Sequence, residues 1–123
     1  MTSFNKWDPL EGIPNRLYVE GLHDDYEGFR ILLKGEKITD RLLRVYFDAP
    51  LAYRSSSECE NSLNLFDPGN GCFYTSQDSD FHKWFNVESS DIYSDILVTH
   101  YVFLAANSII DVLSIDEPKI RWL

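Results

Sequence analysis

The feature that most constrains the fold is the alternation of apolar and polar residues along three stretches of the chain. The clearest is FRILLKG (29–35), in which the residues expected to face inward are Phe29, Ile31 and Leu33. The stretches RLYVEGL (16–22) and RLLRVYFDAP (41–50) show the same period of two. Because alternate residues of a strand point to opposite faces of a sheet, each stretch is predicted to be a strand with one apolar and one polar face.

The segment HDDYEG (23–28) joins the first two of these strands and could be read as a metal site or as a turn. Asp hydrogen-bonds its own backbone in turns, and Gly supplies backbone angles that other residues avoid. Neighbouring strand residues also point to opposite faces, so His23, Asp24 and Asp25 cannot all reach one ion. The prediction is an acidic hairpin tip, with no metal site and no cofactor.

The remaining strands are shorter or follow a break. Proline at position 50 interrupts the third strand, and LAYRSS (51–56) is predicted to continue it after a bend. The longest apolar run, ILVTHYVFLAA (96–106), predicts a central strand over 97–105 that is covered on both faces. The other predicted elements are a loop at 55–71, a strand at 72–76, a hairpin partner at 108–114 and a short closing strand in EPKIRWL (117–123).

One stretch has helical spacing. In DSDFHKWFNV (78–87), three aromatic residues fall at i, i+3 and i+4, and Ser79 is a suitable N-cap. Together these patterns predict an α+β fold in one domain, residues 1–123. It would be an antiparallel sheet of about 6–8 strands built from sequential hairpins, with one main helix near 79–87.

Composition limits the classes of function. The net charge of −9 argues against binding to nucleic acid and to anionic membrane surfaces. No apolar run is long enough to span a membrane, and the first residues do not resemble a signal peptide, so a cytoplasmic protein is expected. With 44% hydrophobic residues the chain can build a core without disulfides, and Cys59 and Cys72 are expected to be free thiols.

No catalytic motif is present, and no catalytic residue is predicted. The sequence lacks a P-loop, a G-x-S-x-G turn and a zinc-binding H-E-x-x-H helix. His82 lies off the apolar stripe of the helix and is expected to be solvated. His100 lies in the central strand, where it is either a core residue with a hydrogen bond or a functional group in a pocket with Tyr101.

Acidic residues are concentrated late in the chain. Residues 72–118 contain eight acidic side chains and a single basic one, Lys83. Such a segment either keeps a protein soluble or meets a basic partner. Tyr93 lies among the acids and is expected to be exposed, where it could anchor a contact. The predicted partner-binding residues are Asp78, Asp80, Glu88, Asp91, Tyr93 and Asp95.

Three stretches also carry a resemblance. They are YVEGLHDDYEGFRILL (18–33), RVYFDAPLAYRSSSE (44–58) and WFNVESSDIYSDILVTHYVFLAANSIIDVLSIDEPKI (84–120). The pattern of residues in these stretches resembles that of small acidic bacterial immunity proteins encoded beside polymorphic or contact-dependent toxins. The resemblance implies a non-enzymatic protein that neutralises a basic toxin, with a nuclease as the expected target. The alternative function is a small-ligand-binding or regulatory domain with a pocket between sheet and helix, near His100 and Tyr101.

Overall fold

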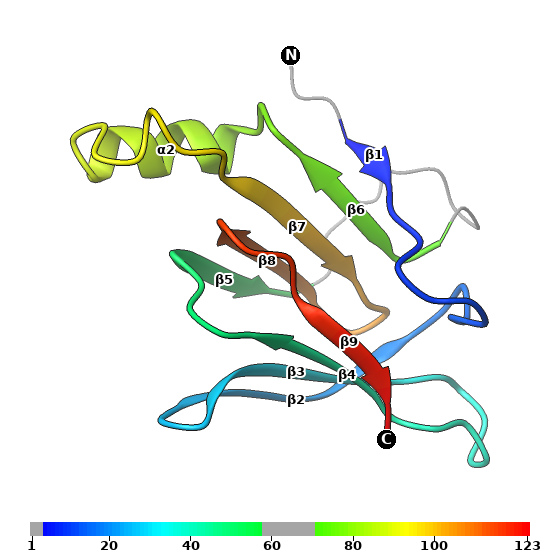
Figure 1. Cartoon of the computed structure of the whole chain (residues 1–123). Coiled ribbons are helices and arrows are strands. Elements are labelled where there is room, and N and C mark those ends of the chain that lie inside the picture. Colours follow the sequence, from blue (N-terminus) through cyan, green and yellow to red (C-terminus); the bar gives the residue numbers. More distant parts are fainter. Residues whose placement is uncertain (1–3, 58–70) are drawn as a thin grey trace.

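Two antiparallel sheets face each other, and one helix lies at the outer end of the larger sheet (Figure 1). The computed structural model describes residues 4–57 and 71–123. Within these residues the strands are β1 (Asn5–Lys6), β2 (Tyr18–Asp25), β3 (Gly28–Lys34), β4 (Leu43–Phe47), β5 (Ala52–Ser56), β6 (Phe73–Ser76), β7 (Thr99–Leu104), β8 (Ile109–Ser114) and β9 (Lys119–Trp122), and the helix is α2 (Asp80–Glu88). The five-stranded sheet has the order β1-β6-β7-β8-β5, and the four-stranded sheet has the order β2-β3-β4-β9.

The predicted α+β class, with antiparallel strands and one main helix, is confirmed. The hairpins β2–β3 and β7–β8 form as expected from the alternation in their sequences. Three further pairings join segments that are distant in the sequence, namely β1 with β6, β4 with β9 and β5 with β8. These long-range pairings divide the strands between two sheets.

The chain changes sheets at Pro50. LAYRSS was expected to continue the preceding strand after a bend, and the bend is present. However, β5 pairs with β8 in the five-stranded sheet, while β4 stays in the four-stranded one. Leu51 N donates to Leu113 O at 2.8 Å, so pairing resumes directly after the proline, which has no N–H to give. Most of the predicted loop 55–71 lies outside the described residues.

The β2–β3 hairpin has a tighter tip than predicted. Asp25 pairs with Gly28, which leaves only Tyr26 and Glu27 in the turn. The prediction that His23, Asp24 and Asp25 form the turn is therefore wrong, because all three belong to β2. The turn closes through the Asp25 side chain, whose Oδ1 accepts from Glu27 N at 2.9 Å, and through Gly28, whose φ is +109°.

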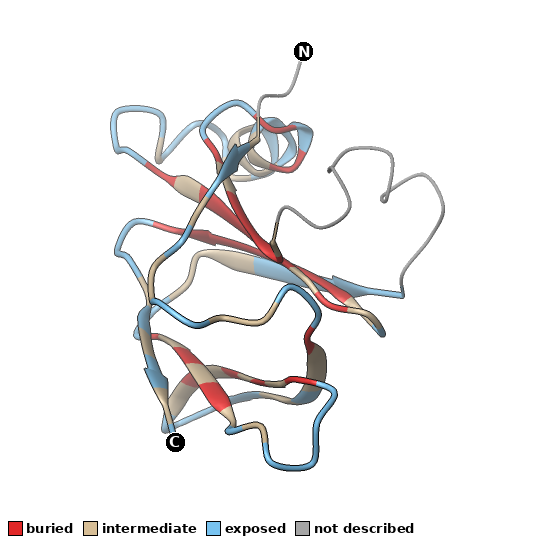
Figure 2. Ribbon diagram, turned by 90° about the vertical axis from the view of Figure 1, so that its right-hand side faces the viewer, coloured by how far each residue is buried: buried red, intermediate tan, exposed pale blue. Residues whose placement is uncertain are grey.

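The main core lies between the two sheets, and buried residues follow their strands (Figure 2). The alternation predicted for β3 holds, since Phe29, Ile31 and Leu33 are at most 1% exposed. Aromatic rings join the two layers. Phe47 of β4 lies 5.4 Å from Tyr101 of β7 between ring centroids, in an edge-to-face arrangement.

Strand β7 is central and covered on both faces, as predicted. Tyr101 and Phe103 enter the core between the sheets, while Val102 joins a second cluster on the opposite face. The strand begins later than predicted, however, at Thr99. Leu97 precedes it and is 73% exposed, so the apolar run at 96–106 extends beyond the strand that it encodes.

Helix α2 begins where predicted. The hydroxyl of Ser79 accepts from His82 N at 3.1 Å, so Ser79 is the N-cap. Phe81 is buried and packs with Val98 and Leu113. Trp84, which was expected on the same buried face, is 52% exposed and stacks on the Phe81 ring. The helix thus rests on the sheet through Phe81, and the partly buried Phe85 packs against the same cluster.

Cys72 is a free, buried thiol that donates to Asn15 O at 3.0 Å. Burial raises the pKa of this thiol. Cys59 lies outside the described residues, so the prediction for it stays a prediction.

Candidate protein-binding surface

The helix α2 and the segment after it, residues 80–97, carry many of the exposed apolar side chains. We call this region the α2 surface. Ten large apolar side chains are exposed in the described part of the chain, and five of them belong to this region. They are Trp84, Val87, Ile92, Ile96 and Leu97, with exposed fractions of 52%, 73%, 73%, 44% and 73%. A region with this many exposed apolar side chains is typical of a surface that another protein covers.

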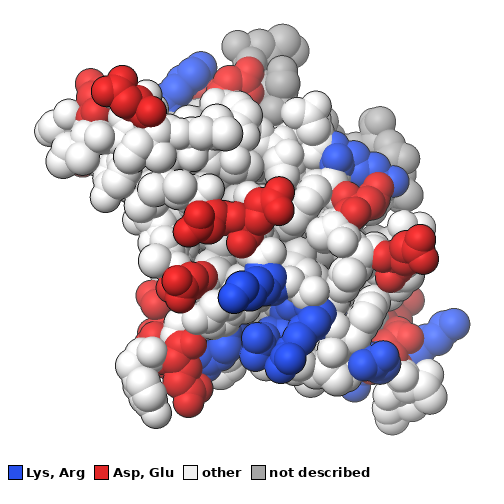
Figure 3. Space-filling view, viewed as in Figure 1, with Lys and Arg blue, Asp and Glu red and all other residues white. Residues whose placement is uncertain are grey.

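Acidic side chains accompany these apolar ones. Asp80, Glu88, Asp91 and Asp95 are all exposed. Acidic side chains are visible at the outer end of the molecule, where α2 lies (Figure 3). Four of the six predicted partner-binding residues are therefore exposed acids on one protruding part of the fold.

The other two predicted residues have structural contacts. Asp78 is exposed, but its Oδ1 accepts from the hydroxyl of Ser76 at 3.0 Å in the turn before the helix. Tyr93 is only partly exposed, and its ring lies 5.4 Å from that of Phe85 between centroids. The expectation that Tyr93 is exposed is wrong, and its role as a contact residue stays a prediction. Its ring instead holds the segment after the helix against the small cluster beneath α2.

The chain leaves the helix through two residues in the left-handed region. Ser90 and Asp91 have φ values of +54° and +59°, which residues other than glycine rarely adopt. Asp91 N donates to Asn86 O at 2.8 Å and so closes the end of the helix. This backbone arrangement fixes the position from which Asp91 and the residues after it project.

Beneath α2 lies a chain of polar contacts that ties the helix to the sheet. His100 of β7 is 1% exposed, with Nδ1 at 2.6 Å from Ser79 Oγ and Nε2 at 2.7 Å from Asp111 Oδ1. Arg54 of β5 completes the chain, since its Nε donates to Asp111 Oδ2 at 2.9 Å. The prediction that His100 is a core residue with a hydrogen bond is confirmed.

The electrostatics of this network centre on Asp111. Burial alone would raise the pKa of its carboxyl, but hydrogen bonds from His100 and Arg54 outweigh burial and hold that pKa below its usual value. Asp111 is therefore ionised at neutral pH. The guanidinium of Arg54 also lies over the Phe81 ring, 4.4 Å from its centroid, so the same side chain contacts both the carboxylate and the helix.

Ser79, His100 and Asp111 contact one another in the same order as the three residues of a serine-hydrolase triad. Their burial, however, indicates a structural role. All three are at most 5% exposed. Ser79 Oγ also accepts from His82 N, so the same hydroxyl caps the helix and contacts His100. No local pattern in the sequence indicates this contact, because Ser79 and His100 are brought together only by the packing of α2 on β7.

The packing does not support the alternative prediction of a ligand pocket between sheet and helix near His100 and Tyr101. The two side chains are neighbours on β7 and point to opposite faces, His100 toward α2 and Tyr101 into the core between the sheets. Tyr101 is 4% exposed. His82, expected to be solvated, is partly buried, with Nδ1 at 3.0 Å from Gln77 O.

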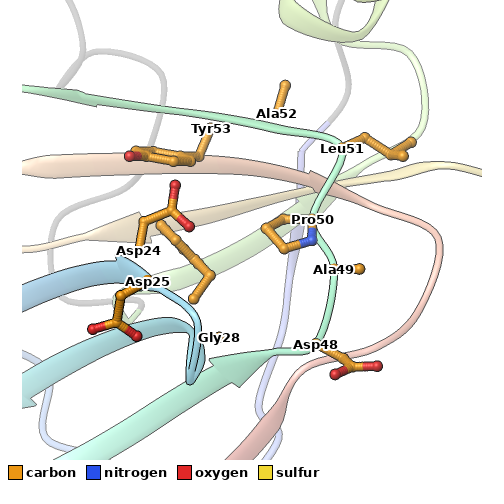
Figure 4. Close-up of a pocket in the computed structure, with 10 residues that line it drawn as sticks. Asp24, Asp25, Gly28, Asp48, Ala49, Pro50, Leu51, Ala52 and Tyr53 are labelled. Carbon is orange, nitrogen blue, oxygen red and sulfur yellow. The ribbon is translucent and has the colours of Figure 1, made fainter.

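A shallow cavity of about 420 Å³ opens between the β2–β3 tip and the β4–β5 connection (Figure 4). Asp24 points toward Tyr53 in this cavity, whereas Asp25 and Asp48 point away from it. Asp25 instead pairs with Arg30 at 2.9 Å, and the hydrogen bond from that guanidinium lowers the pKa of Asp25. A cavity with one inward carboxylate is a weaker basis for a binding site than the α2 surface.

Comparisons with known proteins identify no relative. No protein-family profile matches the chain, and no match was found among curated proteins or solved structures. In the described ranges 4–57 and 71–123, no three His, Cys, Asp or Glu side chains gather as metal ligands, and no helix is long and apolar enough to cross a membrane.

Proposed function

We propose that this chain is a non-enzymatic binding protein of the immunity type, which neutralises a basic toxin in the cytoplasm by covering it with the α2 surface. The observation that carries the proposal is the combination of five exposed apolar side chains with four exposed carboxylates between residues 80 and 97. A surface of this kind is expected to bind a partner that has apolar groups and positive charge.

The two kinds of side chain would serve different steps of binding. Carboxylates attract a basic partner over a distance and raise the association rate. Apolar side chains such as Val87, Ile92 and Leu97 lose contact with water only in the final complex, so they mainly slow dissociation. The polar network from Ser79 to Arg54 supports this division, because it fixes the helix on the sheet before the partner arrives.

A nuclease is the expected class of toxin. Proteins that bind the phosphate backbone carry clustered Lys and Arg, and an acidic protein can occupy such a surface in place of nucleic acid. The net charge of −9 and the resemblance to small acidic immunity proteins both support this expectation. Binding would require no catalytic group on this chain.

The test is to isolate the partner from the native host with the tagged protein and to measure association rates at low and high salt. If the α2 surface binds a basic toxin, Asp91→Lys with Asp95→Lys should lower the association rate about tenfold or more at low salt and flatten its salt dependence. A matched double reversal at exposed acids elsewhere, Glu11→Lys with Glu20→Lys, should change the rate much less. Equal effects of the two pairs, or no effect of either, would refute the proposed surface.

A further inference from the structure

The outer face of the four-stranded sheet is basic although the whole chain is acidic. Strand register places alternate residues on this face, because their neighbours Ile31, Val45 and Ile120 point into the core. The basic side chains that share it are Arg30, Lys34, Arg44, Lys119 and Arg121. We call this region the basic face. Figure 3 shows blue side chains gathered over the region of β4 and β9.

Most of this positive charge is not neutralised by the chain itself. Arg30 pairs with Asp25 and Glu27 at the hairpin tip. Within residues 4–57 and 71–123, the other four basic side chains form no ion pair. Carboxylates from outside the chain could therefore approach them without displacing an existing partner.

The central pair carries a cost that an anion would relieve. Arg44 of β4 lies directly opposite Arg121 of β9, and like charges at such positions destabilise a sheet. Nε of Arg44 is buried and has no hydrogen-bond partner in the described structure, while its guanidinium lies over the Tyr46 ring at 5.4 Å. Packing against Tyr46, and not an ion pair, thus positions this cation.

The surroundings favour carboxylates over nucleic acid as the source of the anion. Nucleic acid would need aromatic faces free for base stacking. The Tyr46 ring is occupied on this face, since Arg44 covers it and a Cβ added at Gly28 would lie 2.5 Å from it. Beside Arg44, Leu32 lies opposite Gly21, which offers an apolar strip next to the charges. A protein surface with carboxylates and apolar side chains matches this face better.

We propose that the occupant of the basic face is the α2 surface of a second copy of the same chain. The α2 surface supplies exposed carboxylates together with exposed Ile92 and Leu97, which suit the Arg44–Arg121 pair and the Leu32 strip. The helix and the four-stranded sheet lie at opposite ends of the molecule (Figure 1), so one chain cannot join its own two surfaces. Two chains meet head to tail, by different surfaces.

This contact goes beyond the proposed function but uses the same α2 surface. A bound toxin and a second copy therefore compete for it. The self-associated form is a resting state, and a basic partner dissociates it by binding the α2 surface of single chains. A head-to-tail contact leaves one α2 surface and one basic face unused in a pair, so further chains add as the concentration rises unless the assembly closes into a ring.

The experiment is sedimentation velocity over a range of protein concentrations at low and high ionic strength. The unmodified protein should show an average mass that rises with concentration at low salt and returns to that of one chain at high salt. Each of two variants should remain a single chain under all conditions. One is Lys119→Glu with Arg121→Glu, which alters only the basic face, and the other is Asp91→Lys with Asp95→Lys, which alters only the α2 surface.

Mixing the two variants gives the decisive result. The first keeps its α2 surface and the second keeps its basic face, so an equal mixture should form complexes of two or more chains that neither variant forms alone. A matched control, Lys6→Glu with Lys37→Glu, should associate as the unmodified protein does. An unmodified protein that stays a single chain at low salt, or a mixture of the two variants that forms no complexes, would overturn the proposal.

The same variants separate this proposal from the proposed function. Lys119→Glu with Arg121→Glu should bind the toxin at an unchanged or higher rate, because its α2 surface is intact. Failure of toxin binding with normal self-association would refute the function alone, and the reverse result would refute the head-to-tail contact alone.

Discussion

The α2 surface and the basic face carry opposite charge, and they arise from the sequence in different ways. The acids of the α2 surface follow one another along a continuous segment, residues 80–95. The basic face is assembled from three strands, and its members at positions 30–34, 44 and 119–121 are separated in the sequence by many acidic residues. A local surface of the first kind is visible in a sequence, whereas one of the second kind requires the register of the sheet.

The difference explains why charge counted along the chain is misleading here. Residues 1–71 contain 12 acidic and 8 basic side chains, which suggests a mildly acidic region throughout. Strand alternation separates these charges in space. Arg30 and Arg44 lie on the outer face of the four-stranded sheet. Asp24 is paired with Phe29 and therefore lies on the inner face. Net charge therefore describes long-range attraction, and the register decides what each face can bind.

The largest effect should come from removing the support beneath the α2 surface. Asp111→Ala leaves Nε2 of His100 buried without an acceptor, which should lower the free energy of unfolding by about 1–3 kcal/mol. Urea denaturation measures the loss. Asp111→Asn retains an oxygen that can accept from His100 and should lose less, and equal losses in the two variants would contradict the hydrogen-bond account.

Acid should weaken the same support. The pKa of Asp111 is lowered in the folded state, so its contribution to stability is complete above the unfolded pKa of about 3.9 and is lost as pH falls through the lower folded value. The difference in unfolding free energy between the unmodified protein and Asp111→Asn should thus shrink below about pH 4. A difference that stays constant down to lower pH would show that ionised Asp111 does not stabilise the fold.

Truncating single apolar side chains should sharpen the comparison at the α2 surface. Val87→Ser and Leu97→Ser remove side chains that are each 73% exposed, so stability should change little, while binding to the basic partner should weaken by about 1 kcal/mol or more each. The loss should appear in the dissociation rate, measured by surface plasmon resonance. Ile38→Ser is the control, because Ile38 is 92% exposed on another part of the molecule. An equal effect of Ile38→Ser would mean that the binding site is elsewhere.

The smallest effect is expected on the basic face, where one substitution should stabilise the protein. Arg121→Glu replaces a like-charge pair with an Arg44–Glu pair across the strands, which should raise the free energy of unfolding by about 0.2–1 kcal/mol. Lys119→Glu lies opposite Tyr46, not Arg44, and should gain less. The two variants can be compared by thermal denaturation, and a loss of stability in Arg121→Glu would contradict the repulsion inferred here.

Local patterns in the sequence predicted most of the individual elements, and failures occurred where distant segments meet. The inward residues of β3 and the Ser79 cap follow from rules that involve only neighbouring positions. Pairing of β5 with β8 depends on segments far apart, so the change of sheet at Pro50 had no local signal. Trp84 has the spacing of a buried residue but is half exposed, since Phe81 and Phe85, and not Trp84, pack against the cluster beneath the helix.

The sequence predicts the acidic residues of the candidate site but not its exposed apolar residues. Asp80, Glu88, Asp91 and Asp95 were identified by charge alone, and all are exposed. Leu97 falls within the predicted strand 97–105, since an apolar run does not indicate where its pairing starts. A usable signal was present at Val87 and Ile92, which are isolated apolar residues within a polar stretch.

The pairing of β9 with β4 has a consequence for how the protein is made. Strand β4 is complete early in synthesis, but its partner on one side is supplied only by residues 119–122. Until the ribosome has released that segment, one side of β4 lacks its partner strand. Contacts that join such distant segments slow folding, because the closure of a long loop must precede them. We therefore expect a slow folder that completes its smaller sheet only once β9 is available, and that is most prone to aggregate while β9 is still missing.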